Sequence, residues 1–146
     1  MRHKISIVIL LSIICVYLNS LRLESFLIQP ILISDLANNS FSFKKESIEN
    51  LNTTFPSLAI NTIPLESIKS RYYLNLKLYD KAIKHAENGV IKNPYLAYTN
   101  YLLARIYIDK NDLKTAKNFL ENANKISPNI KEISILLIAL EKALKK

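Results

Sequence analysis

The C-terminal half of the sequence repeats itself at an interval of 34 residues. Among the residues that this shift aligns identically are Arg71 with Arg105, Tyr73 with Tyr107, Ala82 with Ala116, Glu87 with Glu121, Asn88 with Asn122 and Pro94 with Pro128. Intervals of this length are typical of arrays of paired helices, in which each unit packs on its neighbours. The 146 residues include one glycine, so long helices are easier to build than a many-stranded sheet. The repeat therefore predicts an all-α fold.

Small residues recur where the helices of such a unit have to approach each other closely. Ser70 aligns with Ala104, and Gly89 aligns with Ala123. Residues of this size let two backbones pack at short distance while larger side chains fill the space around them. The larger side chains expected in this core are those of Tyr73, Ile83, Leu103, Tyr107, Phe119 and Leu120. Each unit ends at a proline, because proline cannot continue a helix.

Together these residues resemble the tetratricopeptide repeat family, with units at residues 63–94 and 97–128. The second unit follows the family pattern closely, and its turn "DKNDL" suits the family. The first unit departs from the pattern at two positions: Lys69 stands where the family prefers leucine, and Ala86 where it prefers an aromatic residue. The resemblance implies two helical hairpins over residues 63–129 and a groove lined by the first helix of each hairpin.

Both ends of so short an array need a cover. Residues 130–146 predict an amphipathic helix that caps the last repeat and presents a polar outer face to water. Its apolar face is expected to contain Ile130, Ile133, Leu136, Leu137, Leu140 and Leu144. At the other end, we expect residues 31–62 or a partner protein to cover Ile63.

The N-terminus carries an apolar stretch of membrane-spanning length. Residues 5–22 are mostly apolar and follow the basic residues Arg2, His3 and Lys4. A full crossing needs roughly 17–25 predominantly apolar residues. Because no small-x-small cleavage site follows, we expect an uncleaved anchor over residues 1–22; a cleaved signal peptide and a buried soluble helix are the alternatives. The positive-inside tendency places the N-terminus in the cytoplasm and the remainder outside, which for a bacterial inner membrane means the periplasm.

The segment between the anchor and the repeats is less regular. Residues 23–40 continue the apolar helical spacing and predict a juxtamembrane helix, which Pro30 is expected to kink or break. Residues 41–62 have a mixed composition and predict a linker with room for a short helix between Ser42 and Leu51.

Composition argues against catalysis. Of the two histidines, His3 belongs to the basic N-terminal flank, and we interpret His85 as a surface residue. Asp109 and Asp112 suit a turn and a helix cap better than a metal site. The single cysteine, Cys15, excludes an intramolecular disulfide and a cysteine-based zinc site, and one glycine cannot form a glycine-rich phosphate loop. We therefore predict no enzyme activity, no catalytic residue, no cofactor and no metal.

The repeat positions instead predict a groove that binds a protein or peptide. Its side chains are expected to be Ser67, Arg71, Asn75, Tyr98, Tyr101, Arg105 and Asp109. Arg71 and Arg105 occupy the same place in successive units, and arginine binds carboxylates or phosphates bidentately. The alternative is that both arginines pair with local acids or only cover apolar surface. The carboxylate-clamp pattern of co-chaperone tetratricopeptide domains is not reproduced, because Leu102 replaces an asparagine.

Two functional hypotheses follow. The first is a membrane-anchored interaction scaffold of the bacterial cell envelope, whose partner offers an acidic or extended segment. The second is an accessory or tail module of a glycan-assembly membrane protein, either stand-alone or detached. It rests on the run from Phe55 to Ala116, which resembles the extracytoplasmic C-terminal region of O-antigen ligases and polymerases. The net charge of +8 fits nucleic-acid binding, but the sequence lacks interleaved aromatic residues. The expected orientation also places the array on the opposite side of the membrane from nucleic acid.

Overall fold

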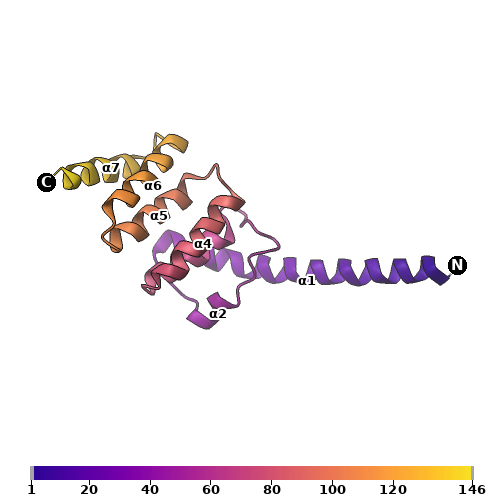
Figure 1. Cartoon of the computed structure of the whole chain (residues 1–146). Helices are drawn as coiled ribbons and strands as arrows, with labels where there is room; N and C mark the ends of the chain where they lie inside the picture. Colours follow the sequence, from indigo (N-terminus) through magenta and orange to yellow (C-terminus); the bar gives the residue numbers. More distant parts are fainter. Residues whose placement is uncertain (1, 146) are drawn as a thin grey trace.

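The computed structural model describes residues 2–145, which fold into helices joined by short connections (Figure 1). The helices are α1 (Arg2–Asn38), α2 (Lys45–Glu49), α3 (Leu65–Asn75), α4 (Tyr79–Lys92), α5 (Ala97–Asp109), α6 (Leu113–Ile126) and α7 (Lys131–Leu144). Helices α3 and α4 form one hairpin, α5 and α6 form the next, and α7 packs on α6. The all-α prediction is confirmed.

The small residues lie where the two helices of each hairpin meet. Ala82, Ala104 and Ala116 are fully buried. Ser70 is also fully buried, and its hydroxyl donates a 2.7 Å hydrogen bond to the carbonyl oxygen of Ala82 on the facing helix. A larger side chain at any of these positions would push the helices apart, because protein interiors are close-packed.

The turns within the two hairpins share one backbone geometry. Lys77 and Asn111, one repeat apart, both have positive φ angles, of 57° and 62°. Asparagine adopts this left-handed conformation more readily than most residues. The carboxylate of Asp112 then accepts a 3.1 Å hydrogen bond from the backbone N–H of Thr115, which caps α6 as the sequence predicts.

The second half of α1, together with α2 and the connections around it, covers the open end of the first hairpin. Leu32 on α1 and Ile48 on α2 are each 1% exposed and belong to one core with Leu65 and Tyr72 of α3. The expectation that the chain itself covers this end is met. The short helix expected between Ser42 and Leu51 is present as α2, and it packs against the array through Ile48.

Helix α1 is not broken at Pro30, which lies inside it. Proline removes one backbone donor, but Pro30 is exposed on α1 and so needs no space in the core. The neighbouring Gln29 is 4% exposed and fixes this part of the helix to the array. Its side-chain amide donates to Ser25 Oγ (2.8 Å) and accepts from the backbone N–H of Ile60 (2.9 Å).

A buried carboxylate joins α1 to α3. Asp35 is 3% exposed and accepts hydrogen bonds from the Tyr72 hydroxyl, the Ser40 hydroxyl and both the hydroxyl and the backbone N–H of Ser42. Burial acts to raise the pKa of Asp35, but these donors outweigh it and hold the pKa below its ordinary value of 3.8. Burial and the contact with Asp35 raise the pKa of Tyr72.

This network predicts a loss of stability in acid. A carboxylate whose pKa is lower in the folded state stabilises the fold above its unfolded pKa, and that contribution disappears as the pH falls through the folded pKa. We expect the free energy of unfolding to fall below about pH 4, the ordinary carboxyl range. Denaturant titrations of the full chain in detergent micelles at a series of pH values measure this. An Asp35→Asn variant should show a shallower acid slope, and an unchanged slope would contradict the prediction.

By length and composition, α1 is the single helix in residues 2–145 that is able to cross a membrane. The qualifying segment is Ile5–Asn38, and its most apolar window has a mean hydropathy of 2.0 and contains no buried residue. The alternative of a buried soluble helix is therefore wrong for this window. A signal sequence passes the same test.

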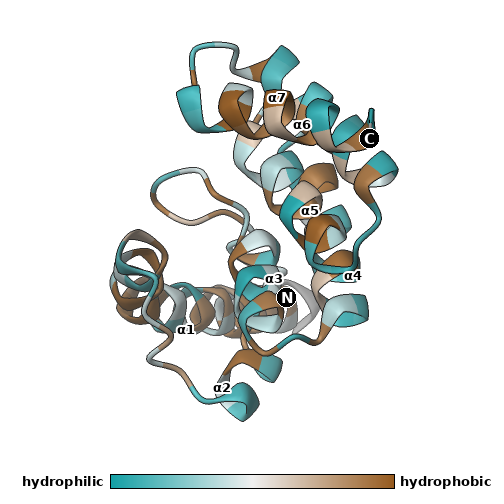
Figure 2. Cartoon of the chain, turned by 90° about the vertical axis from the view of Figure 1, so that its left-hand side faces the viewer, coloured by the Kyte–Doolittle hydropathy of each residue, from teal (hydrophilic) through white to brown (hydrophobic). Residues whose placement is uncertain are grey.

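The capping helix α7 differs from expectation on its outer face. Ile133 and Leu140 are buried against α6, as predicted, but Ile135 and Ile138 are 66% and 53% exposed. Figure 2 shows hydrophobic as well as hydrophilic residues along α7. The prediction of a polar outer face was wrong because the apolar residues of α7 follow each other too closely to share one side of a helix.

Candidate binding groove

The first helices of successive hairpins, α3 and α5, line one face of the array together with α7. On α5, four of the predicted groove residues follow each other at helical spacing, namely Tyr98, Tyr101, Arg105 and Asp109. On α3, Arg71 and Asn75 do the same. Two cavities lie along these positions, one polar and one apolar, and each is described below.

The polar cavity has a volume of about 400 Å³ and lies at the C-terminal ends of α3 and α5. It brings together four of the predicted residues, and its full lining is Asn39, Phe41, Arg71, Leu74, Asn75, Lys77, Arg105 and Asp109. Asn39 and Phe41, which follow α1, also line this cavity and were not predicted. Residues this far from the repeats give no periodic signal that would have placed them in the groove.

The two arginines of this cavity have different surroundings. Arg71 Nη2 donates a 2.6 Å hydrogen bond to Asn39 Oδ1, and its guanidinium lies 5.6 Å from the centre of the Phe41 ring. Arg105 is exposed and, within residues 2–145, makes no hydrogen bond or ion pair. Arg71 is thus held in place by the segment after α1, whereas the donors of Arg105 remain available to a ligand.

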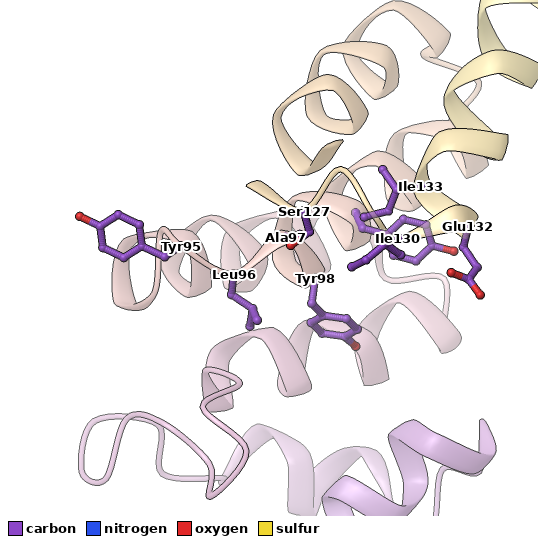
Figure 3. Close-up of a pocket in the computed structure, with 9 residues that line it drawn as sticks. Tyr95, Leu96, Ala97, Tyr98, Ser127, Ile130, Glu132 and Ile133 are labelled. Carbon is purple, nitrogen blue, oxygen red and sulfur yellow. The ribbon is translucent and has the colours of Figure 1, made fainter. Parts of the chain in front are cut away.

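The apolar cavity has a volume of about 340 Å³ and lies between the N-terminal ends of α5 and α7 (Figure 3). Its lining is Tyr95, Leu96, Ala97, Tyr98, Tyr101, Ser127, Ile130, Glu132 and Ile133. In Figure 3, Ile130 and Ile133 lie close together, while Tyr95 points away from the other side chains. Tyr95 is 88% exposed. Tyr98 and Tyr101, both predicted, belong to this end of the groove.

Tyr98 lines the apolar cavity and lies near the two arginines of the polar cavity. Burial raises the pKa of Tyr98 to about 12, and the positive charges of Arg71 and Arg105 act in the opposite direction. Both guanidinium groups are therefore close enough to influence the Tyr98 hydroxyl electrostatically. This face of the array thus carries an apolar cavity lined by Tyr98 and a polar cavity that contains both arginines and Asp109.

Ser67 does not belong to this groove, and its prediction as a groove residue was wrong. It is fully buried, and its hydroxyl shares a 2.8 Å hydrogen bond with the hydroxyl of Thr99 on α5. An ideal Cβ built on Gly89 of α4 would lie 2.2 Å from Ser67 Oγ. Ser67 therefore fills the contact between α3, α4 and α5. Leu102, which replaces the clamp asparagine, is also buried, at 2% exposed.

The interpretation of His85 as a surface residue was also wrong. Its ring stacks on Tyr73 with 5.2 Å between the ring centres, and its Nδ1 lies 2.5 Å from Glu66 Oε2. The Thr53 hydroxyl donates to the other oxygen of Glu66. Burial acts to raise the pKa of Glu66, but the contacts with His85 and Thr53 outweigh it and lower the pKa below 4.5.

The unusual Lys69 belongs to the same side of the first hairpin. It is 7% exposed, and its ammonium donates a 2.7 Å hydrogen bond to the carbonyl oxygen of Glu49, the last residue of α2. Burial lowers the pKa of Lys69, and the nearby carboxylates of Glu66 and Glu49 counteract this effect. The departure from the family leucine was the sequence signal that this face contacts a polar segment.

Comparisons with known proteins agree with this architecture. The model of the tetratricopeptide repeat family matches residues 97–130. The solved structure of the first tetratricopeptide-repeat domain of Spaghetti (RPAP3), bound to the HSP90 peptide SRMEEVD, is similar with a TM-score of 0.64 and 17% identity. The similarity covers 84% of this chain and 94% of that chain. No curated protein matches the sequence. The array therefore has the tetratricopeptide-repeat fold, and residues 97–130 are one such repeat.

Proposed function

We propose that the array is an interaction scaffold, not an enzyme, and that its groove binds an extended segment with acidic and apolar residues. The observation that carries this proposal is the presence of a polar and an apolar cavity on the same face of the array. Arg105 offers unpaired guanidinium donors at one end, and an apolar cavity lined by Tyr98 and Tyr101 lies at the other. Arginine and tyrosine are the side chains that most often anchor protein–protein contacts.

The peptide in the Spaghetti structure, SRMEEVD, has this composition, because it contains three acidic residues beside methionine and valine. In this chain, Leu102 is buried where the clamp pattern has an asparagine. We therefore propose that Arg105 and Arg71 bind acidic side chains of the peptide, and that the carboxylate clamp of co-chaperone domains is not used here.

Charge reversal at Arg105 tests this proposal. Fluorescence anisotropy measures binding of labelled SRMEEVD and of its neutral counterpart SRMQQVN to the full chain in detergent micelles. We expect the acidic peptide to bind more tightly, and Arg105→Glu to weaken it by at least about tenfold, since one charge-assisted hydrogen bond contributes roughly 1.5–3 kcal/mol. Arg71→Glu should act in the same direction.

The matched control is Lys125→Glu, which makes the same charge change on an exposed position of α6 outside both cavities. Binding should be unaffected in this variant. An equal loss for Lys125→Glu and Arg105→Glu would mean that overall charge, and not the groove, determines binding, and the proposal would then fail.

We further propose that α1 is a retained membrane anchor, with its N-terminus in the cytoplasm and the array outside the plasma membrane. Cleavage near the end of the apolar stretch would cut through a continuous helix, because α1 runs from Arg2 to Asn38. Beyond that point the same helix contributes Leu32 and Asp35 to the folded array. The basic residues before Ile5 favour this orientation.

The alternative role, as an accessory module of glycan-assembly machinery in the bacterial envelope, is supported by the same layout. In the O-antigen ligase and polymerase type, a last membrane helix leads into a small repeat domain, and here α1 continues directly into the array. Co-purification of the full chain with a polytopic membrane protein, and loss of that protein on Arg105→Glu, would favour this role.

A further inference from the structure

We propose that one edge of the array inserts into the headgroup layer of the membrane that holds α1, so that the groove has a fixed orientation relative to the bilayer. This inference rests on the proposed role of α1 as an anchor. The edge, called the membrane rim below, consists of exposed apolar side chains from two connections and one helix end. These are Ile60, Ile91 and Tyr95.

The array begins to cover α1 close to the end of the stretch that would span the membrane. A helix of about 20 residues spans the roughly 30 Å hydrocarbon core, and counted from Ile5 it reaches Glu24. Residues 5–20 are all exposed, whereas Leu21 is half-buried and Ser25 is 8% exposed. The array therefore starts to cover α1 at the level where the hydrocarbon core ends, with no spacer between them.

Ile60 of the rim lies at that height. Ile60 is held beside α1 by the hydrogen bond between its backbone N–H and Gln29 Oε1. Gln29 lies five residues beyond Glu24, which is about 8 Å along a helix axis. The headgroup region adds roughly 5–8 Å to each side of the hydrocarbon core. The connection that contains Ile60 thus falls within the headgroup layer.

The other rim residues lie at the same level. Asn93 Nδ2 donates a 3.1 Å hydrogen bond to the carbonyl oxygen of Thr62, which joins the α4–α5 connection to the α2–α3 connection. Ile91 and Tyr95 flank Asn93 and are 75% and 88% exposed. Figure 1 shows the α2–α3 connection on the side of the array that faces the free N-terminal half of α1.

The chemistry of this edge suits a lipid surface. Tyrosine prefers the membrane–water interface, where its ring and its hydroxyl meet different surroundings. Lys92 at the end of α4 is an exposed cation next to Ile91, and such cations are attracted to anionic headgroups. The apolar surface of α1 also continues past Arg22. Its exposed members there are Leu23, Phe26, Leu27 and Ile31.

The chain contains no tryptophan, so single tryptophans report on depth without background. The full chain is reconstituted into vesicles of phosphatidylcholine and phosphatidylglycerol whose acyl chains are brominated close to the headgroup. Ile60→Trp and Ile91→Trp report on the rim, and Leu10→Trp reports on the anchor. Leu76→Trp is the matched control, because Leu76 is 43% exposed but lies at the far end of α3, beyond the level at which Arg71 contacts Asn39.

We expect bromine quenching and a blue-shifted emission for the two rim variants and for Leu10→Trp, and neither for Leu76→Trp. Quenching of Leu10→Trp alone would overturn the membrane rim while leaving the anchor intact. Equal quenching of Leu76→Trp and the rim variants would also overturn it, since the array would then have no preferred edge. If Leu10→Trp escapes quenching, the anchor proposal itself fails, and the rim fails with it.

Discussion

Replacing Asp35 by alanine is expected to lower the free energy of unfolding by about 3 kcal/mol, because it leaves the buried Tyr72 hydroxyl and the part-buried donors of Ser40 and Ser42 without an acceptor. The Tyr72 hydroxyl and the Ser42 N–H both lose their partner, and Tyr72 is only 2% exposed. Denaturant unfolding of the full chain in detergent micelles, followed by the near-ultraviolet circular dichroism of the tyrosines, measures the effect. This signal is preferable to total helicity, to which the free half of α1 also contributes.

Tyr72→Phe is the control for this prediction. It removes one donor but keeps the ring, which packs edge-on against Phe41 at 5.2 Å between ring centres. We expect a smaller loss, of about 1 kcal/mol. The double variant should lose less stability than the sum of the two single losses, because both substitutions remove the same hydrogen bond. Full additivity would show that the contact between Asp35 and Tyr72 contributes nothing to stability.

Replacing Gly89 by valine is expected to cost about 3 kcal/mol, the upper part of the range for overpacking a core. A Cβ at this position would lie 2.2 Å from Ser67 Oγ, and 3.2 Å from both the Ser67 backbone nitrogen and Thr99 Cγ2. The first contact is with a fully buried side chain, and the second is with backbone that cannot rotate away. Thermal melting of the full chain in micelles gives the change.

Two further variants distinguish a steric clash at residue 89 from the loss of backbone flexibility that any replacement of glycine causes. Gly89→Ala should be less destabilising than valine, because alanine favours a helix over glycine by about 1 kcal/mol. Adding Ser67→Ala removes the closest clashing atom, Oγ, and should restore part of the stability. At the same repeat position, Ala123 is fully buried, which shows that the second hairpin accommodates a methyl group there. A Gly89→Val variant as stable as the parent would contradict the close approach of α3, α4 and α5.

The periodic part of the fold could be predicted because its constraints repeat. Ala82 and Ala116, one interval apart, mark the same helix contact twice. A small residue at one position could occur by chance, but a second one at the equivalent position supports the assignment. The N-terminal cover has no such duplicate. The burial of Asp35 depends on donors that approach from α3 and from the connection after α1, and no local pattern in the sequence places those donors together.

The candidate groove shows the same division. Repeat spacing correctly gathered Arg71, Asn75, Arg105 and Asp109 into one cavity. Ser67 was misplaced because helical spacing alone does not distinguish a position facing the groove from one facing the next helix. Because Gly89 has no Cβ, there is room for the Ser67 side chain between the helices. His85 was misplaced because its partner, Glu66, lies on the other helix of the hairpin, 19 residues away in the sequence, where local helical spacing does not bring the two together.

The unbroken passage of α1 into the folded array also limits which partners can be reached. A flexible tether would let the groove sample many positions, and its effective concentration toward a ligand would fall as the tether lengthened. The array is fastened to the helix at Gln29 and Asp35. If α1 is the membrane anchor that we propose, a membrane-bound partner therefore meets the groove by diffusion in two dimensions and at one height. Selectivity among partners would then depend on how far each binding segment stands from the bilayer, as well as on its sequence.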